Sequence, residues 1–137
     1  MGKGRRMTAI LVVEDHNLLV SALLRILRER GGYEVPSVAR SAEQALEQLP
    51  GLHIDLALID ISLPHMSGID LVAMIRLKYP KIPCLMLSGH ASQQYVDRSL
   101  LAGARGYILK EDVPGIILGS QKVLNGGTYF SSGLAGP

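Results

Sequence analysis

Three carboxylates, one hydroxyl and one amine stand at comparable places in the sequence, each just after a short apolar run. They belong to Glu14, Asp15, Asp60, Ser88 and Lys110. If these side chains lie together, the three carboxylates repel one another unless a cation lies between them. Oxygen ligands favour hard divalent cations, so the set predicts a site for Mg²⁺, with Mn²⁺ as an alternative.

The same set of side chains suits phosphoryl transfer. A carboxylate can attack phosphorus as a nucleophile. A divalent cation together with Lys110 would neutralise charge on the transferring phosphoryl oxygens. Ser88 can hydrogen-bond a phosphoryl oxygen once that group is attached. The residue types therefore predict phosphorylation of an aspartate.

Alternating strand and helix patterns must position these residues. Short, fully apolar runs are typical of strands buried on both faces of a parallel sheet, and five strand–helix units predict an α/β protein. In open α/β sheets, ligands bind at the carboxyl ends of the strands, where the polar residues stand. Strands are expected over residues 9–13, 33–39, 54–59, 82–87 and 106–109, and helices over about 19–30, 43–49, 69–79, 92–102 and 113–125.

The two ends of the chain carry weaker signals. Residues 1–7 are expected to form a basic N-terminal tail, and residues 8–125 a single domain.

Gly115 and Gly119 lie inside the last predicted helix, and each lowers the stability of that helix by about 1 kcal/mol relative to Ala. After residue 125 the sequence turns to Gly, Ser and Pro. We therefore expect residues 126–137 to be a linker or C-terminal tail.

Four segments resemble the receiver domain of two-component response regulators. The chain reads VVEDH at 12–16, LIDISLPHMSG at 58–68, LSGH at 87–90 and GARGYILK at 103–110. Each segment is a weak signal alone, but all four occur in the family's order and spacing. The resemblance covers about residues 8–125. It implies a flavodoxin-like three-layer (βα)5 fold whose five-stranded parallel sheet has the order 2-1-3-4-5.

The resemblance also implies a role for each matching residue. Asp60 would accept the phosphoryl group, and Lys110 would pair with it. Ser88 and Tyr107 would form a switch pair that moves inward on phosphorylation. The Mg²⁺ ligands implied by the family are Asp15, Asp60, the Ser62 backbone carbonyl and, directly or through water, Glu14.

Details of the motifs resemble one branch of that family. Lys110 is followed by Glu111 where many receivers have Pro, and GGTY follows at 126–129. Both features are similar to the LuxR-type (NarL/FixJ-like) branch, whose members usually continue into a helix-turn-helix DNA-binding domain. The expected partners are a sensor histidine kinase or phosphotransfer protein and a second copy in a homodimer. DNA would be bound only through an effector domain absent from this chain, which would then be an excised receiver; a stand-alone protein is the alternative.

Two other functions compete with a phosphoacceptor switch. An Mg²⁺-dependent phosphohydrolase with an Asp nucleophile usually carries a second carboxylate two residues later, where Ser62 stands here. A flavodoxin-like cofactor binder needs a phosphate-binding loop after the first strand, where Glu14 and Asp15 would repel an anion. We therefore expect a switch rather than an enzyme, with the phosphohydrolase as the alternative.

Three histidines raise a further question. His16, His65 and His90 fall in loops at the predicted carboxyl edge of the sheet. Histidine is common at protein surfaces, so solvated loop residues are the simpler interpretation. The alternative hypothesis is that one of them tunes the lifetime of the phosphoryl group or binds a transition metal.

Composition limits the classes of protein. The 137 residues indicate one domain, long enough to bury a core without disulfides. A single cysteine, Cys84, excludes a disulfide within the chain, which fits a cytoplasmic protein. No apolar run is long enough to span a bilayer. The net charge of +2 includes Lys3, Arg5 and Arg6, so it does not indicate nucleic-acid binding by the domain.

Overall fold

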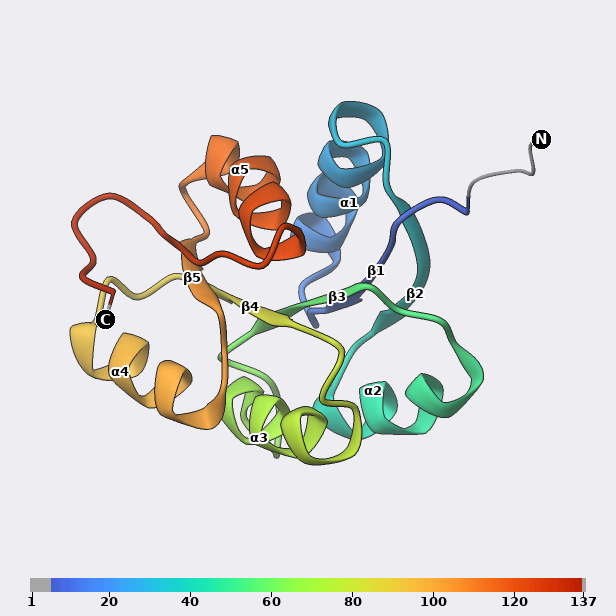
Figure 1. Cartoon of the computed structure of the whole chain (residues 1–137), viewed down its shortest axis with the longest axis horizontal. Coiled ribbons are helices and arrows are strands. Elements are labelled where there is room, and N and C mark those ends of the chain that lie inside the picture. The colour runs from blue at the N-terminus through green and yellow to red at the C-terminus, as the bar shows by residue number, and fades with distance from the viewer. Residues whose placement is uncertain (1–5, 137) are drawn as a thin grey trace.

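A parallel sheet with helices on both faces forms the molecule (Figure 1). The computed structural model describes residues 6–136. Neighbouring strands are all parallel, in the order β2-β1-β3-β4-β5-β6. The strands are β1 (Ala9–Val13), β2 (Glu34–Ala39), β3 (Leu56–Asp60), β4 (Cys84–Ser88), β5 (Gly106–Leu109) and β6 (Tyr129–Phe130).

Five α-helices cover the two faces of the sheet. Helices α1 and α5 lie on one face, and α2, α3 and α4 lie on the other (Figure 1). Their bounds are α1 (Asn17–Arg25), α2 (Ala42–Gln48), α3 (Gly68–Lys78), α4 (Gln93–Ala102) and α5 (Val113–Leu124). A π-helical turn, Ile26–Arg30, extends α1, and a 3-10 turn, Leu49–Gly51, follows α2. Within residues 6–136, no helix is long and apolar enough to cross a membrane.

Alternate strand residues build two separate apolar layers. Leu11 and Val13 face the layer under α2, α3 and α4, whereas Ile10 and Val12 face the layer under α1 and α5. Successive side chains of a strand point to opposite faces of its sheet, so a strand buried on both sides must be apolar throughout. The fully apolar runs predicted from the sequence are therefore the central strands.

The predicted α/β fold and the strand order 2-1-3-4-5 are confirmed, with one addition. The structure adds the two-residue strand β6, which pairs in parallel with β5. This strand lies in the segment that we expected to be a linker or tail. The hydroxyls of Tyr129 and Ser131 donate to Asp112 Oδ2 at 2.7 and 2.6 Å, and Leu109 N donates to Ser131 Oγ at 2.9 Å. These long-range bonds, rather than a periodic pattern, order the segment.

The two glycines of α5 make room for this contact. A Cβ on Gly115 would lie 2.2 Å from Asp112 Oδ2 and 2.8 Å from the Tyr129 hydroxyl oxygen. A Cβ on Gly119 would lie 3.0 Å from the Tyr129 ring. Residues that weaken the isolated helix therefore allow β6 to pack against it.

At the amino ends of the strands, Asp55, the residue before β3, holds the start of β1. Of the predicted basic tail, residues 1–5 lie outside the described residues, but Arg6 Nη1 donates to Asp55 Oδ2 at 3.0 Å. The backbone N–H of Ala9 donates to the same oxygen at 2.8 Å. Burial opposes ionisation of Asp55, but the bonds from Arg6, Ala9 and His53 outweigh it and hold its pKa at about 2.

Replacing Ser131 by Ala should destabilise the protein. The Ser131 side chain is buried, and the change leaves the Leu109 N–H without its partner. We expect the free energy of unfolding, measured by urea titration, to fall by about 1–3 kcal/mol. Ser132→Ala, at the adjacent exposed position, is the matched control and should change it by less than about 0.5 kcal/mol. Equal losses in both variants would contradict the structural role of Ser131.

Asp55 should contribute to stability in a defined pH range. Because folding lowers its pKa from an ordinary value of 3.8 to about 2, its contribution is full above about pH 4 and is lost as the pH falls through about 2. Asp55→Asn keeps an acceptor for the Ala9 N–H but cannot titrate. The variant should therefore lose less stability than the wild type between about pH 4 and about pH 2 in urea titrations. Glu47→Gln, an exposed control, should follow the wild type; a parallel decline in Asp55→Asn would refute the assignment.

Candidate functional site

The carboxyl edge of the sheet brings the strand-end residues together. Asp60 ends β3, Ser88 ends β4, and Glu14 directly follows β1. Parallel register aligns these ends, with Val13 opposite Ile59 and Asp60 opposite Leu87. Glu14, Asp60 and Ser88 are all at most 1% exposed. The predicted gathering of polar groups is therefore present, with these three side chains buried and Asp15 and Lys110 partly exposed.

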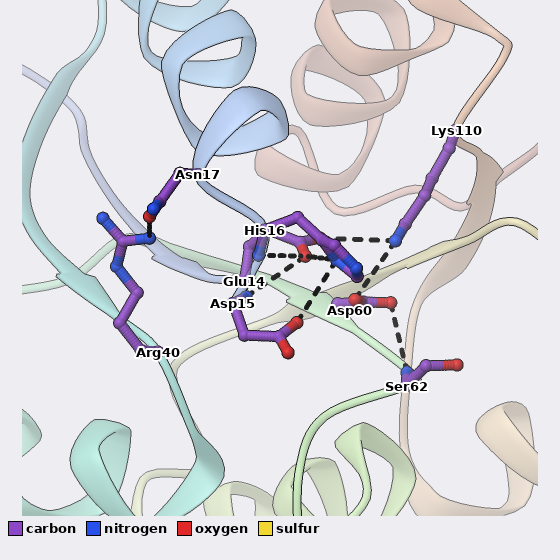
Figure 2. A network of polar contacts seen from close by, with 8 residues as sticks. All are labelled: Glu14, Asp15, His16, Asn17, Arg40, Asp60, Ser62 and Lys110. Carbon is purple, nitrogen blue, oxygen red and sulfur yellow. Dashed lines mark hydrogen bonds and ion pairs between the residues drawn. The ribbon is translucent and has the colours of Figure 1, made fainter.

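Lys110 bridges the two buried carboxylates. Its Nζ lies 3.2 Å from Asp60 Oδ2 and 3.5 Å from Glu14 Oε1, as Figure 2 shows. The other oxygen of Asp60, Oδ1, accepts the Ser62 backbone N–H at 3.1 Å. Each oxygen of Asp60 thus has a donor within 3.2 Å.

Burial opposes ionisation of both carboxylates of this pair, but their pKa values move in opposite directions. Burial, and then the charge of Glu14, raise the pKa of Asp60 to about 6, against the Ser62 N–H and Lys110. Burial also opposes ionisation of Glu14, but hydrogen bonds from His16 and the charge of Lys110 outweigh it and lower its pKa. Glu14 therefore holds its charge more firmly than Asp60 when the two compete for one ammonium group.

His16 joins the acidic group. Its Nδ1 lies 3.0 Å from Glu14 Oε2 and 3.4 Å from Asp15 Oδ1, and the pKa of His16 is raised, chiefly by the bond to Glu14. Glu14 Oε2 also accepts the backbone N–H groups of Asp15 and His16, each at 3.1 Å. Sequence patterns did not distinguish His16 from the other loop histidines, although its place beside two acids was a usable signal.

The donor atoms fit a divalent cation. Ligand atoms of Glu14, Asp15, His16 and Asp60 all lie within 4.8 Å of one another. Glu14 Oε1 is buried and makes no hydrogen bond; it has only the Lys110 ammonium group at 3.5 Å, so it could still accept a metal ion. The predicted Ser62 carbonyl ligand is untested, since the Ser62 contact in the structure is made by its N–H.

The predicted switch pair lies beside the acidic group. Ser88 Oγ accepts the His90 backbone N–H at 3.0 Å. Tyr107 is fully buried, and its hydroxyl donates to the His90 carbonyl at 2.8 Å. Burial raises the pKa of Tyr107, with the Ser88 hydroxyl acting in the opposite direction. Tyr107 is therefore turned inward in this structure, and the loop at His90 connects both members of the pair.

The other histidines of this edge do not enter the acidic group. The His90 ring packs edge-on against Tyr95, with centroids 5.9 Å apart. His65 lies in the loop between β3 and α3 and has a φ of 63°. Among residues 6–136, the acidic group contains no histidine other than His16.

A close backbone approach fixes the loop that follows Asp60. Gly68 N donates to the Ile61 carbonyl at 2.9 Å. A Cβ on Gly68 would lie 2.1 Å from the Asp60 carbonyl oxygen, so only glycine fits there. The loop of the LIDISLPHMSG segment is thereby folded back against the end of β3.

Comparison with known proteins agrees with this arrangement. A model of the response regulator receiver domain matches residues 10–117. The chain is 36% identical to the transcriptional regulatory protein MctR of Rhizobium johnstonii, over 91% of this chain and 59% of that protein. It is 31% identical to the transcriptional regulatory protein UhpA of Escherichia coli, over 94% of this chain and 65% of that protein. The chain thus spans about three fifths of the length of these relatives.

Solved structures show the same fold. A LuxR-family two-component response regulator from Aurantimonas sp. superposes with a TM-score of 0.87 at 25% identity, over 93% of this chain and 91% of that one. The signal receiver domain of the response regulator NarL from Mycobacterium tuberculosis gives 0.83 at 27% identity, over 89% and 99% of the two chains. Together with the matched residues 10–117, these similarities show that the chain belongs to the response regulator receiver domain family, in its LuxR/NarL-type branch.

Proposed function

We propose that this protein accepts a phosphoryl group on Asp60 from a histidine kinase or a phosphotransfer protein and thereby controls an output. One observation carries the proposal. Asp60 is a buried carboxylate whose oxygens contact the Ser62 N–H and the Lys110 ammonium group beside two further acids. Those contacts would hold an attacking carboxylate and then the phosphoryl group attached to it.

The chemistry follows from these positions. A lone pair of an Asp60 oxygen attacks phosphorus, the P–N bond of a phosphohistidine breaks, and its electron pair stays on the imidazole nitrogen. Lys110, 3.2 Å from Asp60 Oδ2, pairs with the charge of the transferred group. A bound Mg²⁺ supplies further positive charge for the phosphoryl oxygens. The residues that would hold it are Glu14, Asp15, Asp60 and the Ser62 backbone carbonyl.

The conformational response to phosphorylation of Asp60 would involve Ser88 and Tyr107. Ser88 Oγ accepts a bond from His90 N, so its own proton is available for a phosphoryl oxygen. A shift of Ser88 would move the loop whose His90 carbonyl accepts the Tyr107 hydroxyl. Because α4 begins at Gln93, just after this loop, the face formed by α4, β5 and α5 would change. The added charge biases a two-state element, and the expected result is a changed homodimer or domain contact.

The output we infer is transcription control. MctR and UhpA are named transcriptional regulatory proteins, and this chain matches 59% and 65% of their lengths. DNA would be contacted by an effector domain outside residues 1–137, and the receiver would regulate it. The phosphohydrolase alternative is less well supported, because the position two residues after Asp60 offers a serine whose N–H faces Asp60 instead of a second carboxylate.

Phosphorylation of Asp60 is tested by incubating the protein with Mg²⁺ and acetyl phosphate and weighing it intact. The wild type should gain the mass of one phosphoryl group, and Asp60→Asn should gain none, because an amide cannot attack phosphorus. Asp55→Asn, at the opposite edge of the sheet, is the control and should be modified like the wild type. No adduct on the wild type, or an equal adduct on Asp60→Asn, would contradict the proposal.

The switch role of Ser88 is separable from phosphorylation. Ser88→Ala should still form the adduct, but phosphorylation should shift the backbone amide NMR signals of residues 93–102 much less than in the wild type, because no hydroxyl draws the loop inward. Ser132→Ala, an exposed serine elsewhere, should show the full shifts. Full-sized shifts in Ser88→Ala would show that the loop responds without this hydroxyl.

A further inference from the structure

We propose that His16 supplies a nitrogen ligand to the cation site, so that the protein binds Mn²⁺ and Co²⁺ in preference to Mg²⁺. The inference deepens the proposed function, on which it rests, because it concerns the cation at the same carboxylates. It assigns to His16 a chemistry that the acidic residues alone do not provide.

Geometry is the first support. The His16 Nδ1 lies 3.0 Å from Glu14 Oε2 and 3.4 Å from Asp15 Oδ1. Adjacent ligands of an octahedral ion with bonds of about 2.1 Å are separated by about 3.0 Å. Figure 2 shows the imidazole ring beside the carboxylates of Glu14 and Asp15, with dashed lines marking the contacts. An ion at this place would replace the hydrogen bond between Nδ1 and Glu14 Oε2, and the Nδ1 proton would leave to solvent. The ion would then be within reach of this nitrogen and of the oxygens beside it.

A buried oxygen provides the second, independent support. Glu14 is fully buried, and its Oε1 has no hydrogen-bond partner. The ammonium group of Lys110, 3.5 Å away, carries only one positive charge and is shared with Asp60. With all three carboxylates ionised and His16 neutral, Lys110 leaves two negative charges unbalanced. A divalent ion would balance them and would give Glu14 Oε1 a closer contact than Lys110 does.

The backbone explains why the His16 ring points at this group. His16 is the residue before α1, in an extended conformation with φ −87° and ψ 115°, and its side chain makes no capping bond to the helix. Its carbonyl accepts the Val20 N–H at 2.9 Å, which anchors the residue at the helix start. The ring is thus held beside the acids while 67% of the side chain remains exposed, within reach of an ion from solvent.

The nitrogen donor decides which ion is favoured. Imidazole suits transition metals, whereas Mg²⁺ prefers ligands that are all oxygen. Carboxylate oxygens at Asp15 and Asp60 accept either kind of ion. A fourth donor of the imidazole type should therefore raise the affinity for Co²⁺ and Mn²⁺ without a comparable gain for Mg²⁺.

The opposite role for His16 is that its ring only occupies the acidic group and must leave when a metal binds. The two roles differ in sign. Removing a ligand weakens metal binding, whereas removing a competitor strengthens it. His16→Gln tests this directly because glutamine keeps a polar side chain but lacks the imidazole.

The experiment uses the untagged full chain with Mn²⁺ as the probe. Electron spin echo envelope modulation should detect the nitrogen of a directly bound imidazole in the wild type and in the control His65→Asn. Asparagine suits that control because it tolerates the positive φ of His65. The nitrogen signal should vanish in His16→Gln. Calorimetry should show Mn²⁺ and Co²⁺ binding weakened about tenfold or more, with Mg²⁺ binding changed less than about twofold.

Three results would overturn the proposal. They are the absence of a nitrogen signal in the wild type, its persistence in His16→Gln, and metal binding in His16→Gln that is as tight as in the wild type or tighter. The variant Asp15→Asn tests whether the ion bound by His16 lies at the carboxylates. This variant should lose most Mn²⁺ binding, and an unchanged nitrogen signal in it would also overturn the proposal. Failure here is distinct from failure of the proposed function, because the acetyl phosphate adduct on Asp60 is measured separately with Mg²⁺.

Discussion

Repulsion between buried carboxylates governs the functional edge of this protein. Glu14 and Asp60 are at most 1% exposed, so water screens their charges weakly and the pKa of Asp60 rises to about 6. Lys110 offsets part of that repulsion by lying between them. Such a site responds strongly to any added charge, because its electrostatic balance is incomplete without a cation. This imbalance is the property on which the proposed phosphorylation of Asp60 would act.

The rest of the fold holds these charges in place. Two apolar layers bury both faces of the central strands, which fixes the strand ends relative to one another. Lys110 is the residue directly after β5, and its backbone N–H donates to the Ser88 carbonyl at 2.8 Å. The preceding residue, Leu109, is held by Ser131, which is bound in turn to Asp112. The C-terminal segment thus helps to position the lysine that neutralises the site.

Much of this arrangement was predictable from sequence. Apolar runs and helical periodicity indicated the first five strands and all five helices because burial imposes those periods locally. Parallel topology then placed the strand-end residues at one edge. The strand β6 was not predicted, since two residues carry no periodicity and its order comes from bonds to Asp112 and β5. Gly115 and Gly119 were predicted only to weaken α5; their packing role depends on Tyr129, which that strand brings to the helix.

By itself, the sequence determined which chemical groups follow the strands, because side-chain type and spacing are local properties. Only the tertiary structure decided how those groups share their contacts. In the folded protein the His16 side chain lies within the acidic group, whereas His65 and His90 lie outside it. The fold also brings the Tyr107 hydroxyl to the His90 carbonyl, to which it donates a hydrogen bond. Loop direction and side-chain orientation depend on neighbours distant in the chain. Three histidines that all fall in loops at the carboxyl edge of the sheet therefore have different contacts in the folded protein.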